Sequence, residues 1–94
     1  MARRIVRLRI VGRVQGVGYR DFVRREAEAR GLAGWVRNRR DGTVEALVSG
    51  AAESVDELVA ACWRGPPGAR IADIQIETPE SAETPAGFVI RPTA

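Results

Sequence analysis

A glycine-rich segment that ends on an arginine contains the residues best suited to chemistry. The segment is Gly12-Arg13-Val14-Gln15-Gly16-Val17-Gly18-Tyr19-Arg20. Because Gly16 and Gly18 lack a Cβ and adopt positive φ readily, successive backbone N–H groups can turn toward one centre and form a concave anion site. Arg20 adds a planar guanidinium that can donate two parallel hydrogen bonds to a phosphate edge, which lysine cannot do. The segment therefore predicts a phosphoryl-binding loop. We expect its residues to be Gln15, Gly16, Val17, Gly18, Tyr19 and Arg20.

The elements on either side of this loop favour an anion site over a simple tight turn. Residues 4–11 alternate as a half-buried strand does, and residues 20–30 have helical spacing with Gly31 as the stop. A helix that begins at about Arg20 would direct its unpaired N–H groups and the positive end of its dipole at the loop. The spacing fits neither a Walker loop, since no Lys-Ser/Thr pair follows, nor a dinucleotide fingerprint.

The rest of the chain predicts four strands and one helix. The strands cover residues 35–38, 43–48, 71–77 and 88–91, and Asp41-Gly42 marks a hairpin turn between the first two. The helix has Val55, Leu58, Val59 and Cys62 on one face, and Gly65-Pro66-Pro67-Gly68 ends it. Its start is either a capping box between Ser54 and Glu57 or a position one turn earlier, near Ala52.

This order of elements predicts the fold class. The pattern β-α-β-β-α-β with a short extra C-terminal strand indicates an α+β, ferredoxin-like sandwich, with an antiparallel sheet and two helices on one face. The length of 94 residues suits a single domain over residues 1–94. No run of apolar residues is long enough for a membrane span, and the N-terminus lacks the apolar stretch of a signal peptide, so we expect a cytoplasmic protein.

Two features of the composition narrow the chemistry. The chain has no histidine, which excludes Ser-His-Asp and Cys-His catalysis, histidine zinc sites and phosphohistidine intermediates. Its single cysteine, Cys62, allows no internal disulfide and offers no metal-ligand spacing, and its place on an apolar helix face predicts a core residue.

The arginines are unevenly distributed along the chain. Residues 1–40 contain twelve arginines and three acidic residues, a net charge of +9, whereas residues 41–94 contain three arginines and nine acidic residues, a net charge of −6. Such asymmetry could steer an anionic substrate or a nucleic acid. The alternative is a mixed charged surface without a specific partner.

Four segments resemble the acylphosphatase family in order and spacing, and they span nearly the whole chain. They are Gly12–Arg20, Gly31-Leu32-x-Gly34-Trp35-Val36-x-Asn38, Asp41-Gly42-x-Val44-Glu45 and Phe88-x-Ile90-Arg91. The resemblance implies a hydrolase that cleaves the carboxyl-phosphate bond of small-molecule acyl phosphates without a metal or other cofactor. On the family pattern Arg20 binds the phosphate and Asn38 orients the attacking water. One departure is Arg39, which stands where some relatives carry a small hydroxyl residue, and whether Arg39 or Arg13 assists the site is left open.

This reaction needs few groups. The leaving group of an acyl phosphate is a carboxylate, a weak base that departs without a strong general acid. Phosphoryl transfer then depends mainly on positioning and on charge stabilisation, which loop amides and an arginine can supply. Asparagine is too weak a base to take the proton of water, so we infer that the proton passes to a phosphate oxygen.

Two other functions compete with this interpretation. The same order of elements builds an RNA-recognition fold, which stacks bases on aromatic residues of the open sheet face. The outward positions of the two central strands carry no aromatic ring, and Glu45 there is expected to pair with Arg7 or Arg9. These positions are Ile5, Arg7, Arg9 and Val11 on one strand and Thr43, Glu45, Leu47 and Ser49 on the other.

The third candidate is a carbamoyl-phosphate-binding relative. We expect no nucleic acid or membrane partner, a monomer, and inorganic phosphate or sulfate as a ligand of the loop.

Overall fold

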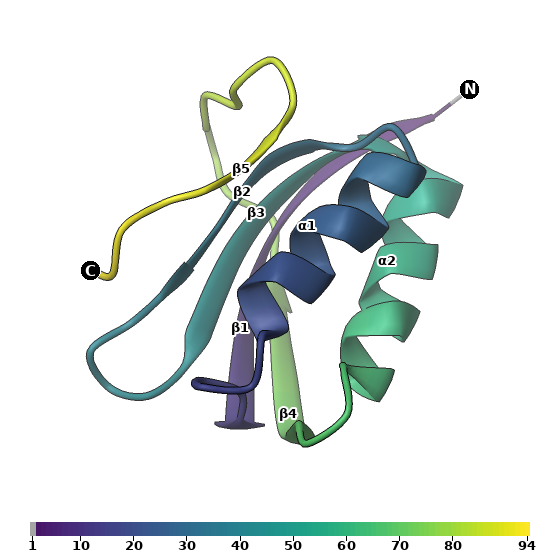
Figure 1. Cartoon of the computed structure of the whole chain (residues 1–94). Coiled ribbons are helices and arrows are strands. Elements are labelled where there is room, and N and C mark those ends of the chain that lie inside the picture. Colours follow the sequence, from purple (N-terminus) through teal and green to yellow (C-terminus); the bar gives the residue numbers. More distant parts are fainter. Residues whose placement is uncertain (1) are drawn as a thin grey trace.

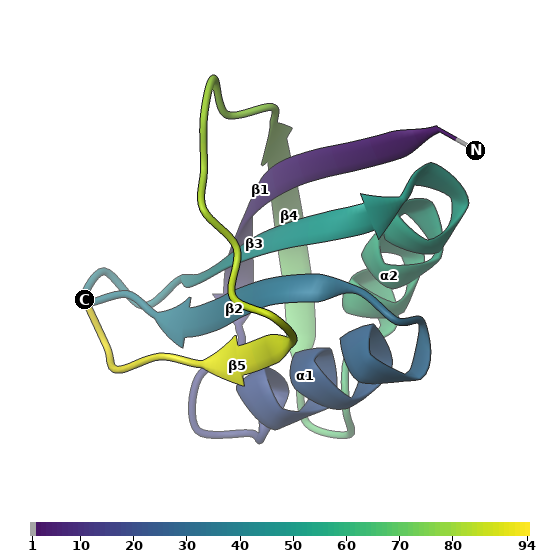
Figure 2. The same ribbon diagram turned by 90° about the horizontal axis from the view of Figure 1, so that it is seen from above.

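Five strands and two helices form the part of the chain that the computed structural model describes, residues 2–94 (Figure 1). Their bounds are β1 (Arg3–Arg13), α1 (Tyr19–Ala29), β2 (Ala33–Asn38), β3 (Val44–Ala51), α2 (Ala52–Arg64), β4 (Arg70–Glu77) and β5 (Phe88–Ile90). Both helices cover the same face of the sheet (Figures 1 and 2). The ferredoxin-like α+β arrangement is confirmed. Most strands are longer than predicted, because their backbones continue to pair with the neighbouring strand beyond the residues whose side chains alternate between apolar and polar.

The sheet has the order β4-β1-β3-β2-β5. Four of the strands pair antiparallel, but β5 runs parallel to β2, so the prediction of a wholly antiparallel sheet is wrong for this strand. The parallel direction of β5 follows from the position at which β4 ends. Glu77 lies level with Arg7 of β1, near the end of the sheet at which β2 begins, so the connection over residues 78–87 enters β5 in the direction of β2. Figure 2 shows this connection passing from one edge of the sheet to the other.

Helix α2 begins one turn earlier than the capping box would place it. Its N-cap is Ala51, with no side-chain cap hydrogen bond, so the predicted box between Ser54 and Glu57 is wrong and the alternative start near Ala52 is confirmed. The helix follows β3 without a loop, and the N–H of Ala52 donates to the carbonyl of Ala2 at 3.0 Å. A backbone carbonyl thus satisfies one of the N–H groups at the helix start that have no partner within the helix.

Helix α1 ends where the sequence predicts. Gly31 has φ of 67°, and two hydrogen bonds close the helix, from Gly31 N–H to the Glu28 carbonyl at 3.1 Å and from Leu32 N–H to the Ala27 carbonyl at 3.0 Å. This is the Schellman arrangement, which needs a left-handed residue after the helix. The chain is thereby turned directly into β2, whose far end carries Asn38.

Gly34 gives a testable constraint on the sheet. It has φ of 144°, and a Cβ there would collide with the backbone carbonyl of Leu47 on β3. We predict that Gly34→Ala lowers the free energy of unfolding by about 3 kcal/mol in urea titrations, because strand pairing must shift. Gly31→Asn is the control, since its position is open and asparagine tolerates left-handed backbone; its cost should be under about 1 kcal/mol. Equal losses for the two variants would contradict this account.

Candidate active site

The loop between β1 and α1 has the backbone conformation that the sequence predicts. Gly16 and Gly18 have φ of 77° and 76°. A Cβ at either position would meet no atom within 4 Å, so the glycines are needed for their conformation rather than for space. Gly18 is the N-cap of α1, and the first helical bond runs from Phe22 N–H to the Gly18 carbonyl at 3.1 Å. The N–H groups of the preceding first turn therefore have no helical partner and are available to a ligand.

A cavity of about 220 Å³ brings the predicted loop and both predicted catalytic residues together. Its lining residues are Val14, Gly16, Gly18, Tyr19, Arg20, Asp21, Asn38 and Ile90. Two predicted loop residues are not among them, because the Val17 side chain packs against the core and the Gln15 side chain bonds to the β2–β3 turn. Val14, Asp21 and Ile90 line the cavity although they were not predicted as site residues. The only signal for Val14 and Ile90 was their place in the first and last segments of the family pattern, and Asp21 had none.

Arg20 lines this cavity beside Asp21, whose carboxylate pairs with other arginines. The neighbouring Asp21 carboxylate accepts from Arg24 at 2.6 Å and pairs with Arg25 at 3.0 Å. The hydrogen bond from Arg24 holds the pKa of Asp21 below its ordinary value, so the carboxylate stays charged and paired on the exposed side of α1. Within residues 2–94 no ion pair engages Arg20. Arg20 is half-buried, and its guanidinium is therefore available to bind an anion.

Asn38 lines the same cavity and carries a buried side-chain acceptor. It is the last residue of β2, where it pairs with Val44 of β3, and its backbone carbonyl accepts from Ala94 N–H at 3.0 Å. Its side-chain Oδ1 is buried, and no group in the described residues donates a hydrogen bond to it. Buried polar atoms in native proteins nearly always have a partner, so an unpaired acceptor in a cavity points to a water or ligand partner.

Tyr19 and Cys62 have structural roles. The Tyr19 hydroxyl donates to the Cys62 backbone carbonyl at 2.7 Å, which ties the start of α1 to α2. Burial raises the pKa of both groups, to about 12 for the Cys62 thiol, so both stay neutral at physiological pH. The predicted core role of Cys62 is confirmed, since its side chain is fully buried.

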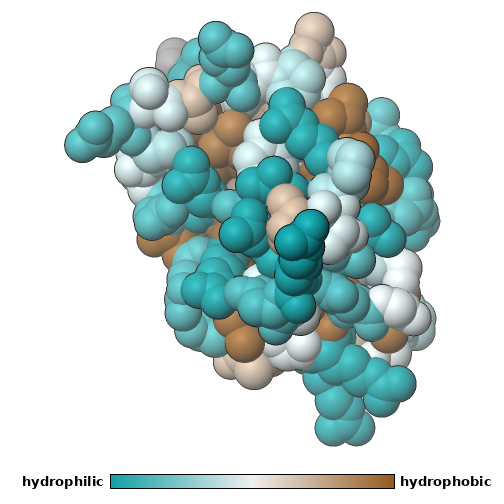
Figure 3. Space-filling model, turned by 90° about the vertical axis from the view of Figure 1, so that its left-hand side faces the viewer, coloured by the Kyte–Doolittle hydropathy of each residue, from teal (hydrophilic) through white to brown (hydrophobic). Residues whose placement is uncertain are grey.

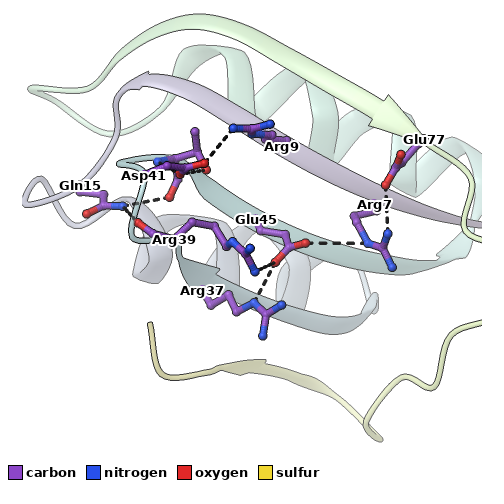
Figure 4. A network of polar contacts seen from close by, with 9 residues as sticks. Arg7, Arg9, Gln15, Arg37, Arg39, Asp41, Glu45 and Glu77 are labelled. Carbon is purple, nitrogen blue, oxygen red and sulfur yellow. Dashed lines mark hydrogen bonds and ion pairs between the residues drawn. The ribbon is translucent and has the colours of Figure 1, made fainter. Parts of the chain in front are cut away.

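A larger cavity, about 340 Å³, lies on the open face of the sheet, but its charges are already paired. Glu45 accepts from Arg37 at 2.8 Å and from Arg39 at 3.3 Å, and its other oxygen is 3.9 Å from Arg7. Arg9 pairs with Asp41 instead, at 2.8 Å, so the expected partner of Glu45 is Arg7 rather than Arg9. Figure 4 shows this network. Arg39 therefore faces away from the loop cavity, and neither it nor Arg13 lines that cavity.

One aromatic ring does lie on the open face, but it is covered. Trp35 on β2 pairs with Leu47 and is only 7% exposed. The guanidinium groups of Arg37 and Arg91 lie 4.6 and 5.1 Å from its ring centroid. Figure 3 shows that hydrophilic groups dominate the face seen there. Among the described residues 2–94, the open face of the sheet thus offers no exposed ring for base stacking of the kind seen in RNA-recognition folds.

Comparison with known proteins identifies the family. A family model described as Acylphosphatase matches residues 6–90. The chain belongs to the acylphosphatase family. It is 53% identical over 88 residues to an acylphosphatase from Rhizobium meliloti, a match that covers 94% of this chain and 93% of the relative. The crystal structure of the Bacillus subtilis acylphosphatase superposes with a TM-score of 0.88 at 42% identity, covering 93% of this chain and 97% of that one. The expectation of an acylphosphatase is confirmed.

The same fold also occurs within a longer protein. Full-length HypF, in a phosphate- and nucleotide-bound form, superposes with a TM-score of 0.86 at 28% identity. The match covers 98% of this chain but only 12% of HypF. Across residues 2–94 of the present chain, neither helix is long and apolar enough to cross a membrane.

The assignment of Cys62 to the core predicts that its thiol is dispensable for catalysis. Cys62→Ala should keep the wild-type kcat for an aryl acyl phosphate, while losing about 1 to 2 kcal/mol of unfolding free energy because a small cavity is left behind. A thiol-specific reagent should leave the folded wild-type enzyme active, since the buried thiol stays protonated. Rapid inactivation by that reagent, absent in Cys62→Ala, would show that the thiol is accessible and that this assignment is wrong.

Proposed function

We propose that the chain hydrolyses the carboxyl-phosphate bond of small-molecule acyl phosphates with Arg20 and Asn38 as its catalytic residues. The observation that carries this assignment is that Asn38, whose Oδ1 is buried and has no hydrogen-bond partner among the described residues, lines the same cavity as the glycine loop and Arg20. The cavity thus combines anion donors with a neutral acceptor for water. These are the groups that the transfer of a phosphoryl group to water requires.

The phosphoryl group binds between the loop and Arg20. Backbone N–H groups of the loop and of the first turn of α1 donate to its oxygens, and the Arg20 guanidinium donates from the side. Because these donors are fixed before the substrate arrives, they can stabilise the charge that spreads over the equatorial oxygens in the transition state. The same donors should hold free inorganic phosphate or sulfate.

The water is held by Asn38. Its Oδ1 accepts a hydrogen bond from the water, which orients an oxygen lone pair toward phosphorus. Asparagine does not take the proton; it passes to a phosphate oxygen as the new bond forms. The bond between phosphorus and the acyl oxygen breaks, and the carboxylate leaves with its electron pair. Since the leaving group is a weak base, we propose that no metal or other cofactor takes part.

We further propose that the protein acts in the cytoplasm as a monomer. The support is the single buried thiol, which suits a reducing compartment. One copy of the chain also brings the loop, Arg20 and Asn38 to one cavity, so the proposed chemistry requires no residue from a second copy.

Variants at the two catalytic positions should separate binding from rate. Arg20 contacts the phosphoryl group throughout the reaction, so Arg20→Lys should weaken both inhibition by inorganic phosphate and kcat, because an ammonium does not replace the planar fork. Asn38→Ala should lower kcat on the order of 10²-fold while leaving the phosphate inhibition constant nearly unchanged. Steady-state kinetics with an aryl acyl phosphate measures both. An Asn38→Ala enzyme with near-normal kcat would contradict the assigned role.

Inhibition and substrate measurements should distinguish an acylphosphatase from a nucleic-acid-binding module and from a carbamoyl-phosphate-binding relative. Hydrolysis of an aryl acyl phosphate should be unchanged by a chelator and competitively inhibited by inorganic phosphate. An RNA oligomer should not inhibit at about 0.15 M salt, where exposed charges are screened. Activity that returns only with a divalent ion would overturn metal independence. Inhibition by RNA but not by phosphate would favour a nucleic-acid module. Faster turnover of carbamoyl phosphate than of any other acyl phosphate would favour the carbamoyl alternative.

A further inference from the structure

The Gln15 side chain connects the phosphate loop to the turn between β2 and β3. Its amide nitrogen donates to the backbone carbonyl of Arg39 at 2.8 Å and to that of Thr43 at 2.9 Å (Figure 4). Carbonyl oxygens only accept, so both partners require the nitrogen on this side and fix the orientation of the amide. The two hydrogen bonds are partly buried. They join the loop to a segment 24 to 28 residues further along the chain.

The two acceptors stand at opposite ends of the turn that follows Asn38. Arg39 N–H donates to the Thr43 carbonyl at 2.8 Å, and Gly42 N–H donates to the Arg39 carbonyl at 3.1 Å. Gln15 therefore adds a second hydrogen bond to each carbonyl and holds the turn as one unit. Asn38 is the last residue of β2 and directly precedes this turn, so the position of the turn bears on the position of Asn38.

The other contacts of the turn differ from the Gln15 hydrogen bonds, because none of them comes from the phosphate loop. Asp41 accepts from the Thr43 N–H and hydroxyl, which orders the turn internally and lowers the pKa of Asp41. Arg9 reaches Asp41 from β1, but both side chains are about half exposed, so solvent screens the pair. Backbone bonds with Ala94 hold the turn on the side of β5. Among these contacts, the Gln15 side chain is the one that reaches from the phosphate loop itself.

We propose that the Gln15 side chain is a positioning residue that fixes Asn38 relative to the bound phosphoryl group. The inference rests on the proposed function, since it assigns Gln15 to the placement of the attacking water. The loop sets where phosphorus lies, and the turn sets where Asn38 holds the water. In-line attack tolerates little misplacement, and a shift of about 1 Å can cost on the order of 10²-fold in rate.

The test uses a near-isosteric variant and a matched control. Gln15→Met keeps the side-chain length and removes both hydrogen bonds, whereas Arg9→Gln removes the exposed link to the same turn. We expect Gln15→Met to lower kcat about 10- to 100-fold, with the phosphate inhibition constant changed less than about twofold. Arg9→Gln should keep the wild-type kcat. In an Asn38→Ala background, Gln15→Met should cause no further loss, because the group through which it acts is gone.

A charge variant adds a pH signature. In Gln15→Glu a carboxylate would face two carbonyl oxygens, which raises its pKa above the ordinary value of about 4.3. Its activity relative to wild type should be lowest at neutral pH and rise as pH falls through that pKa, because the protonated carboxyl can donate one hydrogen bond. The activity of Gln15→Met relative to wild type should stay flat over the same range. A flat ratio for Gln15→Glu as well would contradict the proposal.

The outcomes separate this inference from the proposed function. If the wild-type protein hydrolyses no acyl phosphate, the proposed function fails, and the inference with it. If the wild type is active but Gln15→Met keeps its kcat, or its loss adds fully to that of Asn38→Ala, the inference alone fails. A parallel loss of kcat and phosphate affinity would also overturn it, because Gln15 would then shape the loop. Faster amide exchange at Gly42 in Gln15→Met, without faster global unfolding, would support it.

Discussion

The reversal of the chain at Gly16 and Gly18 is the constraint on which the site depends. Left-handed backbone at both positions turns the chain from the end of β1 into α1 and leaves the first amides of that helix facing the loop. A β-carbon would find open space at either glycine, so the constraint is on backbone conformation and not on volume. The Schellman turn at Gly31 then leads the chain into β2, which carries Asn38 to the same cavity.

Ion pairs on the open face of the sheet and on α1 determine which arginine is available to bind an anion. The open face concentrates arginines, yet Arg7, Arg9, Arg37 and Arg39 all lie within ion-pair distance of Glu45, Asp41 or Glu77. Asp21 pairs with Arg24 and Arg25 on the outer side of α1. Cavity size alone would favour the open face, whereas the unpaired Arg20 and the unpaired Asn38 acceptor favour the smaller loop cavity. The unpaired polar groups that line a cavity therefore identify the candidate site better than the cavity volume does.

Local patterns predicted much of the fold but only part of the site. Alternation, helical spacing and the glycines located the elements and the positive-φ turns, because these depend on neighbouring residues. The prediction that Arg20 and Asn38 share one site came from the family pattern. That the two residues line one cavity depends on how β2 pairs with β3 and how α1 packs. The direction of β5 could not be predicted because it depends on a long connection. The capping box does not form because α2 follows β3 without a loop. The side-chain contacts of Gln15 could not be predicted, because they join the loop to a turn fixed only in the tertiary structure.

The most direct test of the central claim is a titration of the ¹⁵N-labelled protein with inorganic phosphate, followed by amide chemical shifts. This measurement reports where an anion binds without requiring turnover. The account predicts saturable shifts concentrated at Gly16, Gly18, Tyr19 and Arg20, with smaller changes at Asn38, and their loss in Arg20→Lys. Shifts concentrated instead at Arg7, Arg9 and Arg39 of the open face, with the loop unaffected, would contradict it.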